Sequence, residues 1–96
     1  MPTFRLTVKA ISDLKSIALY THDKWGREQR NKYLKELDEC FRMLAVDPKL
    51  GRSCDGILPG YRKYHLNRHL VFYRESEEGI LIIRILHDRM DTESHL

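Results

Sequence analysis

The sequence predicts an α+β domain, a helical hairpin packed on a mostly antiparallel four-stranded sheet in the order β-α-α-β-β-β. Two segments repeat apolar residues at three- and four-residue steps, as amphipathic helices do. One segment before them and three after them have the patterns of short strands. The last of these contains the run Ile80-Leu-Ile-Ile-Arg-Ile-Leu86, which is typical of a central strand covered on both faces.

The first strand and the first helix are distinguished by a change of period. Thr3–Val8 alternates polar and apolar residues, which predicts a half-buried strand. From Ala10 the spacing becomes helical, so we expect an amphipathic helix to about Lys24. Gly26 follows at once, and glycine is common after a helix because it tolerates left-handed backbone angles.

The second helix is predicted from about Arg27 to Ala45 and ends before Asp47-Pro48. Its apolar stripe consists of Leu34, Leu37, Phe41 and Leu44. Because almost no residues separate the two helices, they should fold back on each other as an antiparallel hairpin.

The second half of the chain begins with a long loop, Asp47 to Gly60, which has two prolines, three glycines and no periodicity. Loops of this length in compact domains often bind something. Three strands are predicted after the loop, with a tight turn and then an acidic turn between them. Their ranges are Tyr61–Leu66, His69–Tyr73 and Ile80–His87.

The length of 96 residues predicts a single domain over residues 1–96. The chain has no apolar run of 18 residues, so we expect no membrane partner and a cytoplasmic location. Cys40 and Cys54 lack metal-ligand spacing and are expected to be free thiols. The histidines also lack neighbouring ligands, so we expect neither a metal nor a cofactor.

The formal net charge is +3, and its distribution is uneven. Between Lys49 and Arg74 there are six basic residues and one acid, a local excess of +5 before histidines. Such a patch could attract a phosphate backbone or an acidic protein partner, or be ordinary solubilising charge. The basic residues are Lys49, Arg52, Arg62, Lys63, Arg68 and Arg74.

A series of motifs from Thr3 to Asp91 resembles the ParE toxins of the RelE/ParE superfamily of type II toxin–antitoxin modules. The C-terminal motif is the most specific, whereas the spacing of the first helix would suit any amphipathic helix. The motifs are Ala10-x-x-Asp13-Leu14-x-x-Ile17-x-x-Tyr20, Gly26, Tyr33-Leu34, Pro48-x-x-Gly51, Gly60-x-Arg62, His69-x-x-x-Tyr73 and Arg84-Ile-Leu-His87-x-Arg89-Met90-Asp91.

The resemblance implies a toxin that traps DNA gyrase on cleaved DNA and has no catalytic residues of its own. It also implies neutralisation by a ParD-like antitoxin and indirect contact with the DNA that gyrase holds. The candidate target-binding residues are Arg62, Arg68, Arg84, His87, Arg89 and Met90, and the candidate antitoxin-binding residues are Tyr20 and Trp25. A copy that is no longer toxic and serves as an antitoxin-bound regulator is a further interpretation.

The alternative function is a ribosome-dependent messenger RNA endonuclease of the RelE type. Cleavage of RNA without a metal needs an acid or base, which His87 could supply, and cations such as Arg62, Arg68 and Arg84. However, Asp88 follows His87 and would repel substrate phosphates. The nuclease members commonly carry a tyrosine near the C-terminus, but this chain has no tyrosine beyond Tyr73. These two differences from the nuclease pattern favour the gyrase-inhibiting members of the superfamily.

Structural roles remain open for two of these candidates. His87 could pack at the strand end against Asp88 or Asp91 instead of contacting a target. Arg84 lies inside an apolar strand, where an unpaired charge would be costly, so it should reach a carboxylate or an open face of the sheet.

An edge strand, Thr3–Val8 or Tyr61–Leu66, could dock an antitoxin.

Overall fold

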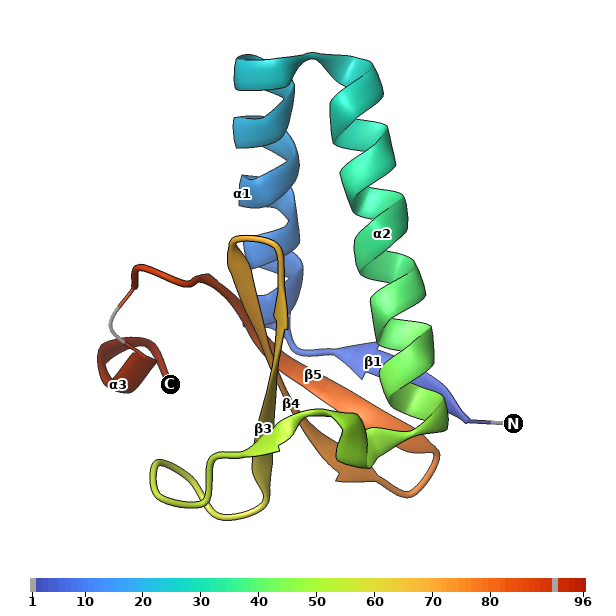
Figure 1. Ribbon diagram of the computed structural model, residues 1–96, viewed down its shortest axis with the longest axis vertical. Coiled ribbons are helices and arrows are strands. Elements are labelled where there is room, and N and C mark those ends of the chain that lie inside the picture. Colours follow the sequence, from blue (N-terminus) through green and yellow to red (C-terminus); the bar gives the residue numbers. More distant parts are fainter. Residues whose placement is uncertain (1, 91) are drawn as a thin grey trace.

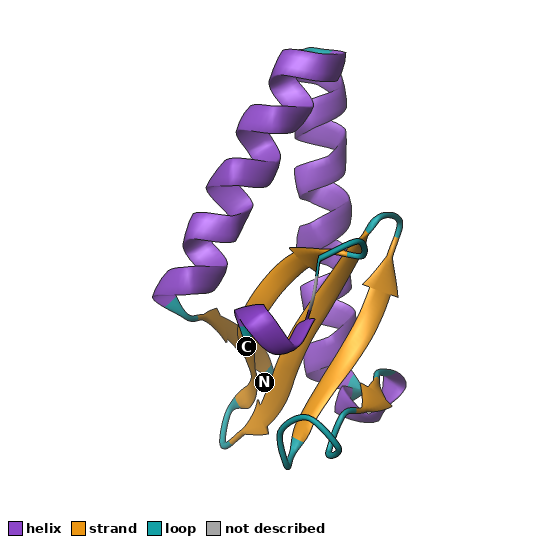
Figure 2. Ribbon diagram, turned by 90° about the vertical axis from the view of Figure 1, so that its left-hand side faces the viewer, coloured by secondary structure: helices purple, strands orange, loops and turns teal. Residues whose placement is uncertain are grey.

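The computed structural model describes residues 2–90 and 92–96, and it has the predicted two layers. The helical hairpin of α1 and α2 covers one face of a twisted sheet, and its tip stands away from the sheet (Figures 1 and 2). The elements are β1 (Thr3–Leu6), α1 (Val8–Trp25), α2 (Arg27–Val46), a 3-10 turn (Pro48–Leu50), β2 (Arg52–Ser53), β3 (Tyr61–Leu66), β4 (His69–Ser76), β5 (Gly79–His87) and α3 (Thr92–His95).

The sheet has the strand order β1-β5-β4-β3-β2, with β1 parallel to β5 and every other pair antiparallel. The α+β class is therefore confirmed, but the sheet has five strands where four were predicted. The additional strand is β2, in which Arg52 pairs with Lys63 and Ser53 pairs with Arg62. Two residues are too few to show a period, so this strand left no pattern in the sequence.

Thr7 explains why the first strand is shorter and the first helix longer than predicted. Its hydroxyl oxygen accepts a hydrogen bond from the Ala10 N–H at 3.1 Å, which is the N-cap arrangement, so α1 begins at Val8. The same hydroxyl donates to the Ile83 carbonyl at 2.7 Å. One side chain thus ends β1, starts α1 and ties both to β5.

The apolar residues form two cores, one on each face of the sheet. The larger core lies between the hairpin and the sheet, where Leu37 and Leu44 of α2 meet Ile82 of β5 with no exposed surface. The smaller core lies on the opposite face around Phe72 and Leu86. Because β5 contributes to both cores, the prediction of a strand covered on two faces is confirmed. Cys40 and Cys54 are both free and buried.

Tyr73 holds the long loop against the sheet. Its hydroxyl donates to the Pro48 carbonyl at 2.7 Å and accepts from the Gly51 N–H at 2.8 Å. Arg62 donates to the Gly51 carbonyl at 2.8 Å, so three groups converge on this turn. Burial raises the pKa of the Tyr73 hydroxyl, which keeps it a donor at neutral pH.

Among the described residues, no helix is long and apolar enough to span a bilayer.

We expect Gly79→Ala to lower the free energy of unfolding by about 2 kcal/mol, because an added Cβ would overlap the backbone of its partner Thr3. Gly79 also has φ 152°, which L-residues rarely adopt. Gly56→Ala is the matched control, since the space around Gly56 is open. Urea denaturation of both variants gives the comparison, and equal midpoints would contradict the expectation.

Candidate functional site

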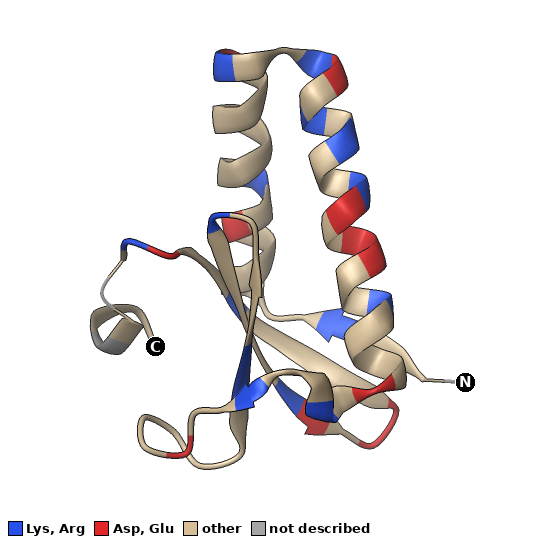
Figure 3. Cartoon of the chain, viewed as in Figure 1, with Lys and Arg blue, Asp and Glu red and all other residues tan. Residues whose placement is uncertain are grey.

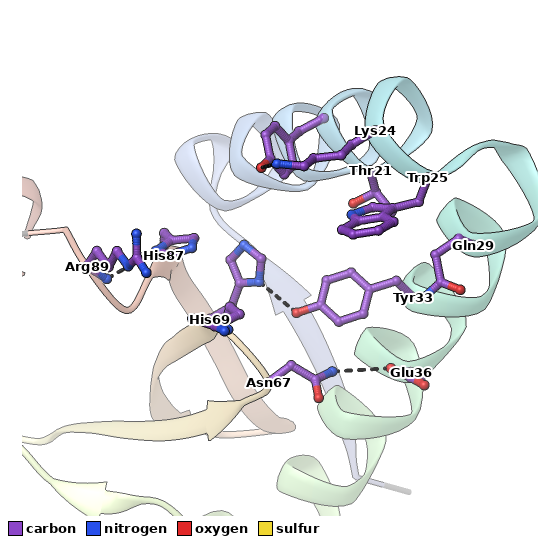
Figure 4. Close-up of a pocket in the computed structure, with 12 residues that line it drawn as sticks. Thr21, Lys24, Trp25, Gln29, Tyr33, Glu36, Asn67, His69, His87 and Arg89 are labelled. Carbon is purple, nitrogen blue, oxygen red and sulfur yellow. Dashed lines mark hydrogen bonds between the residues drawn. The ribbon is translucent and has the colours of Figure 1, made fainter.

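A pocket of about 580 Å³ lies where the upper hairpin faces the β3–β4 turn and the end of β5. The helices contribute one wall and the strand ends contribute the other, as Figure 4 shows. The lining residues are Tyr20, Thr21, Lys24, Trp25, Gln29, Tyr33, Glu36, Asn67, Arg68, His69, His87 and Arg89.

The register of β4 and β5 brings two histidines together in this pocket. His69 begins β4 and His87 ends β5, and the two residues are direct partners in the ladder. Their rings meet edge to face with centroids 5.6 Å apart. The turn before β4 contains Asn67, at φ 54°, whose side-chain amide donates to Glu36 of α2 at 3.3 Å. The turn is thus tied to the helix that forms the opposite wall.

Tyr33 links α2 to the histidine pair. The Tyr33 hydroxyl lies 2.6 Å from Nδ1 of His69, in a part-buried contact. Burial raises the pKa of Tyr33 to about 12, so the hydroxyl stays protonated at neutral pH. It also lies 3.4 Å from the Leu66 carbonyl, to which it can donate. Burial, and next the neighbouring His87, lower the pKa of His69. The site therefore favours a neutral imidazole on His69.

The end of β5 is ordered by a second group of contacts. The Asp88 carboxylate lies 3.3 Å from Nδ1 of His87 and 3.3 Å from Nε2 of His65 on β3. Nδ1 of His87 accepts the Arg89 N–H at 3.1 Å, and the Asp88 N–H donates to the Arg68 carbonyl at 2.8 Å. His87 therefore contacts Asp88, as one of the two interpretations expected, while Asp91 lies outside the described residues.

Five of the predicted site residues come together around the pocket: Tyr20, Trp25, Arg68, His87 and Arg89. Tyr20 and Trp25 are 62% and 64% exposed, and the Lys24 ammonium lies 5.6 Å and 6.0 Å from their ring centroids. Target and antitoxin candidates therefore share one concave surface, although the sequence suggested two separate groups.

Three predicted target-binding residues lie outside this pocket. Arg62 is on β3 and bonds the Gly51 carbonyl. Arg84 makes a two-pronged ion pair with Asp13 of α1, with both N–O distances 2.8 Å, and also donates to the His95 carbonyl. Met90 is 47% exposed beyond the end of β5. The expectation that Arg84 reaches a carboxylate agrees with this geometry.

Tyr33 and His69 were not predicted as site residues from the sequence. Both were motif positions of the resemblance, but Tyr33 lay within the predicted second helix and His69 at the start of a predicted strand, so neither was given a binding role. Their contact spans 36 residues of sequence, so only the folded hairpin reveals it.

Among residues 2–90 and 92–96, no group of three or more His, Cys, Asp or Glu side chains is placed to hold a metal ion.

Loss of the Asp13 carboxylate should destabilise the fold strongly. Asp13→Asn leaves Arg84 without its counter-charge in a site where the two side chains are only 14% and 17% exposed. We expect a loss of about 2–3 kcal/mol of unfolding free energy, slightly below the range for a fully buried pair. Asp38→Asn is the control, because its one-turn pair with Arg42 is exposed to solvent and should contribute far less. Similar losses for both variants in urea titrations would refute a structural role for the Arg84 pair.

The lowered pKa of His69 predicts that stability falls on acidification. Because the folded state disfavours the charged ring, this contribution is fully present above the ordinary pKa of 6.5 and is lost as the pH falls from there through the lower pKa of the folded state. His69→Gln, whose amide can still form a hydrogen bond with Tyr33, should flatten the stability profile between about pH 7.5 and 5. His22→Gln, on the exposed side of α1, is the control. Unfolding free energies at several pH values test this, and identical slopes for His69→Gln and the parent would reject it.

Comparison with known proteins agrees with this architecture over nearly the whole chain. The family model described as ParE toxin of type II toxin-antitoxin system, parDE, matches residues 4–92. Toxin ParE1 of Mycobacterium tuberculosis is 40% identical over 94 residues, 97% of this chain and 96% of the relative. Toxin ParE1 of Caulobacter vibrioides is 36% identical over 96 residues, 100% and 99% of the two chains.

A solved structure, described as the chromosomal ParDE TA system from P. aeruginosa, superposes on this fold with a TM-score of 0.76. It is 25% identical in sequence, and the match covers 91% of this chain and 96% of that one. Fold, sequence relatives and family model agree, and the chain belongs to the ParE toxin family of type II toxin–antitoxin systems.

Proposed function

We propose that this chain inhibits DNA gyrase by trapping the enzyme on cleaved DNA and that a ParD-like antitoxin neutralises it. The observation that carries the proposal is membership of the ParE toxin family across residues 4–92. Inhibition of this kind needs a binding surface and no catalytic group. Gyrase works in the cytoplasm, which is where we place the action of the toxin.

The chemistry of the pocket favours binding over catalysis. Tyr33 holds its proton, with a pKa of about 12, and is a poor general base at neutral pH. The ring nitrogens Nδ1 of His69 and His87 are engaged by Tyr33 and by the Arg89 N–H. The Asp88 carboxylate beside His87 would also repel the phosphates of an RNA substrate. These contacts support a gyrase inhibitor more than a nuclease.

The exposed cations at the strand ends are the proposed gyrase contacts. Arg68 and Arg89 are exposed and lie on the wall of the pocket, with His87 at the end of β5 and Met90 just beyond. Arg62 and Arg84 bond groups of the fold, so we propose that they support this surface by holding the loop and β5 in place.

The aromatic residues at the hairpin tip are the proposed antitoxin contacts. Tyr20 and Trp25 are exposed on α1, and Leu19 beside them is 65% exposed. An amphipathic antitoxin segment could bury these side chains in a helix-in-groove mode. The edge strand β1 pairs only with β5 in the described sheet and offers a second docking place.

The proposal is tested with purified gyrase in plasmid supercoiling and cleavage assays. We expect the parent protein to inhibit supercoiling and to accumulate cleaved plasmid. Arg68→Glu combined with Arg89→Glu should weaken inhibition at least about tenfold, because reversing rim charges slows association and opposes a complementary partner. Inhibitor titration against a fixed gyrase concentration gives the comparison.

The matched control is Lys9→Glu combined with Lys35→Glu, which makes the same change of charge on exposed helix positions away from the pocket. Thermal unfolding of each variant verifies the fold. An RNA degradation assay on translating ribosomes runs in parallel. Intact gyrase activity together with messenger RNA cleavage that disappears in His87→Gln would replace this proposal with the nuclease alternative.

A further inference from the structure

Three basic residues form a row on the face of the sheet that the hairpin leaves free. Phe72 of β4 packs in the smaller core on this face, and its partner in β3 is Lys63. Lys63 in turn pairs with Arg52 of β2. Arg74 pairs with Tyr61 of β3, whose side chain also packs in the smaller core, so Arg74 points to the same side. Arg52, Lys63 and Arg74 thus occupy neighbouring positions on three adjacent strands.

Figure 3 shows this clustering, with basic residues on β2, β3 and β4 close to one end of the sheet. Arg52 and Arg74 are exposed, and Lys63 is half-buried. An oxygen of Asp55 accepts the Gly60 N–H. Arg74 shares a surface hollow with Glu75, Glu77 and Glu78, at and beside the β4–β5 turn. The positive charge of the row is therefore least balanced at Arg52 and Lys63.

The row is unfavourable for folding. Arg52 and Lys63 are directly opposite each other, and like charges in cross-strand pairs destabilise a sheet. The ion pairs found among the described residues use other cations, namely Arg5, Arg42, Arg84 and histidines. These ion pairs of the described residues leave the repulsion between Arg52 and Lys63 uncompensated, so an anionic ligand would relieve it.

We propose that this basic row binds the phosphate backbone of duplex DNA. Neighbouring strands lie about 4.8 Å apart, and Arg74 lies two residues along β4 from the position opposite Lys63. The row therefore runs diagonally over roughly 12 Å and can neutralise successive phosphates. The described aromatic residues on this face, Tyr61 and Phe72, pack in the smaller core and leave no platform on which unstacked bases could lie. Duplex is therefore favoured over single strands, and contact is independent of base sequence.

This contact is a second binding function, because the row lies on the other side of the sheet from the hairpin pocket. It does not depend on gyrase inhibition and can be measured without gyrase. In combination with an enzyme that already holds DNA, it would let the toxin touch enzyme and DNA at once.

The experiment uses the full chain and a fluorescein-labelled DNA duplex of about 20 base pairs and mixed sequence, long enough to offer several phosphates to the row. Fluorescence anisotropy gives the dissociation constant from about 50 to 200 mM KCl. The variant combines Arg52→Gln, Lys63→Gln and Arg74→Gln. The matched control combines Lys9→Gln, Lys32→Gln and Lys35→Gln, which removes the same charge from the helices.

Three lost phosphate contacts should reduce the slope of log affinity against log salt by about 2.7. Over this roughly fourfold salt range, the parent should therefore lose about 40-fold more affinity than the row variant. The control should keep the parent slope. The row variant should also unfold at the same temperature as the parent or higher, because a like-charge pair is removed.

Equal slopes for the row variant and the parent would overturn the assignment of these residues. Failure of the parent to bind duplex DNA at the lowest salt concentration would overturn the proposal as a whole and leave an acidic protein as the partner of the row. Tighter binding to a single-stranded RNA of the same length would overturn the choice of duplex DNA. None of these results depends on whether gyrase is inhibited.

Discussion

The rest of the structure depends on how α1 attaches to the edge of β5 that β1 leaves uncovered. β1 accompanies β5 only as far as the Leu6–Ile82 pair, so the backbone of β5 beyond that point needs other partners. Thr7 supplies two of them, its N–H to the Ile82 carbonyl and its hydroxyl to the Ile83 carbonyl. Asp13 supplies the third, accepting the Ile85 N–H at 2.9 Å while it also holds Arg84. The start of the hairpin thereby replaces a missing strand.

This attachment sets the position of the pocket. With the first two turns of α1 fixed to β5, the hairpin tip projects beyond the sheet, as Figure 2 shows. The first turn of α2 contains no buried residue, and the end of α1 exposes Leu19, Tyr20 and Trp25. Neighbouring exposed apolar side chains are typical of contact surfaces, which is why we propose this one for the antitoxin. Exposure of this kind suits a protein that is normally held by a partner.

The pocket under the hairpin has two kinds of polar group. Some already have hydrogen-bond partners within the fold, and others are cations exposed to solvent. Tyr33, His69 and the turn around Asn67 form a hydrogen-bonded floor that joins the two layers. Arg68 and Arg89 lie at its rim and keep their charges in water. A hydrogen-bonded floor with a charged rim would suit the protein target that we propose, because rim charges guide association. The basic row on the far face would add a second polar surface, so the molecule carries two faces of different character.

The order of the elements, the hairpin and the membership of β5 in two cores were all predictable from the amino-acid sequence, because they follow from local periodicity. The motifs along the chain were also similar enough to those of the ParE toxins for the family to be recognised from the residues alone. What depends on residues far apart in the chain was decided by the packing of the layers. Strand β2 is defined by its pairing with β3. Arg84 pairs with Asp13, which lies 71 positions earlier in the chain. The pairing of Tyr33 with His69 likewise required the hairpin to close over the strand ends. Local patterns record which surface each element must bury, whereas side-chain partners across elements are chosen only when the layers pack.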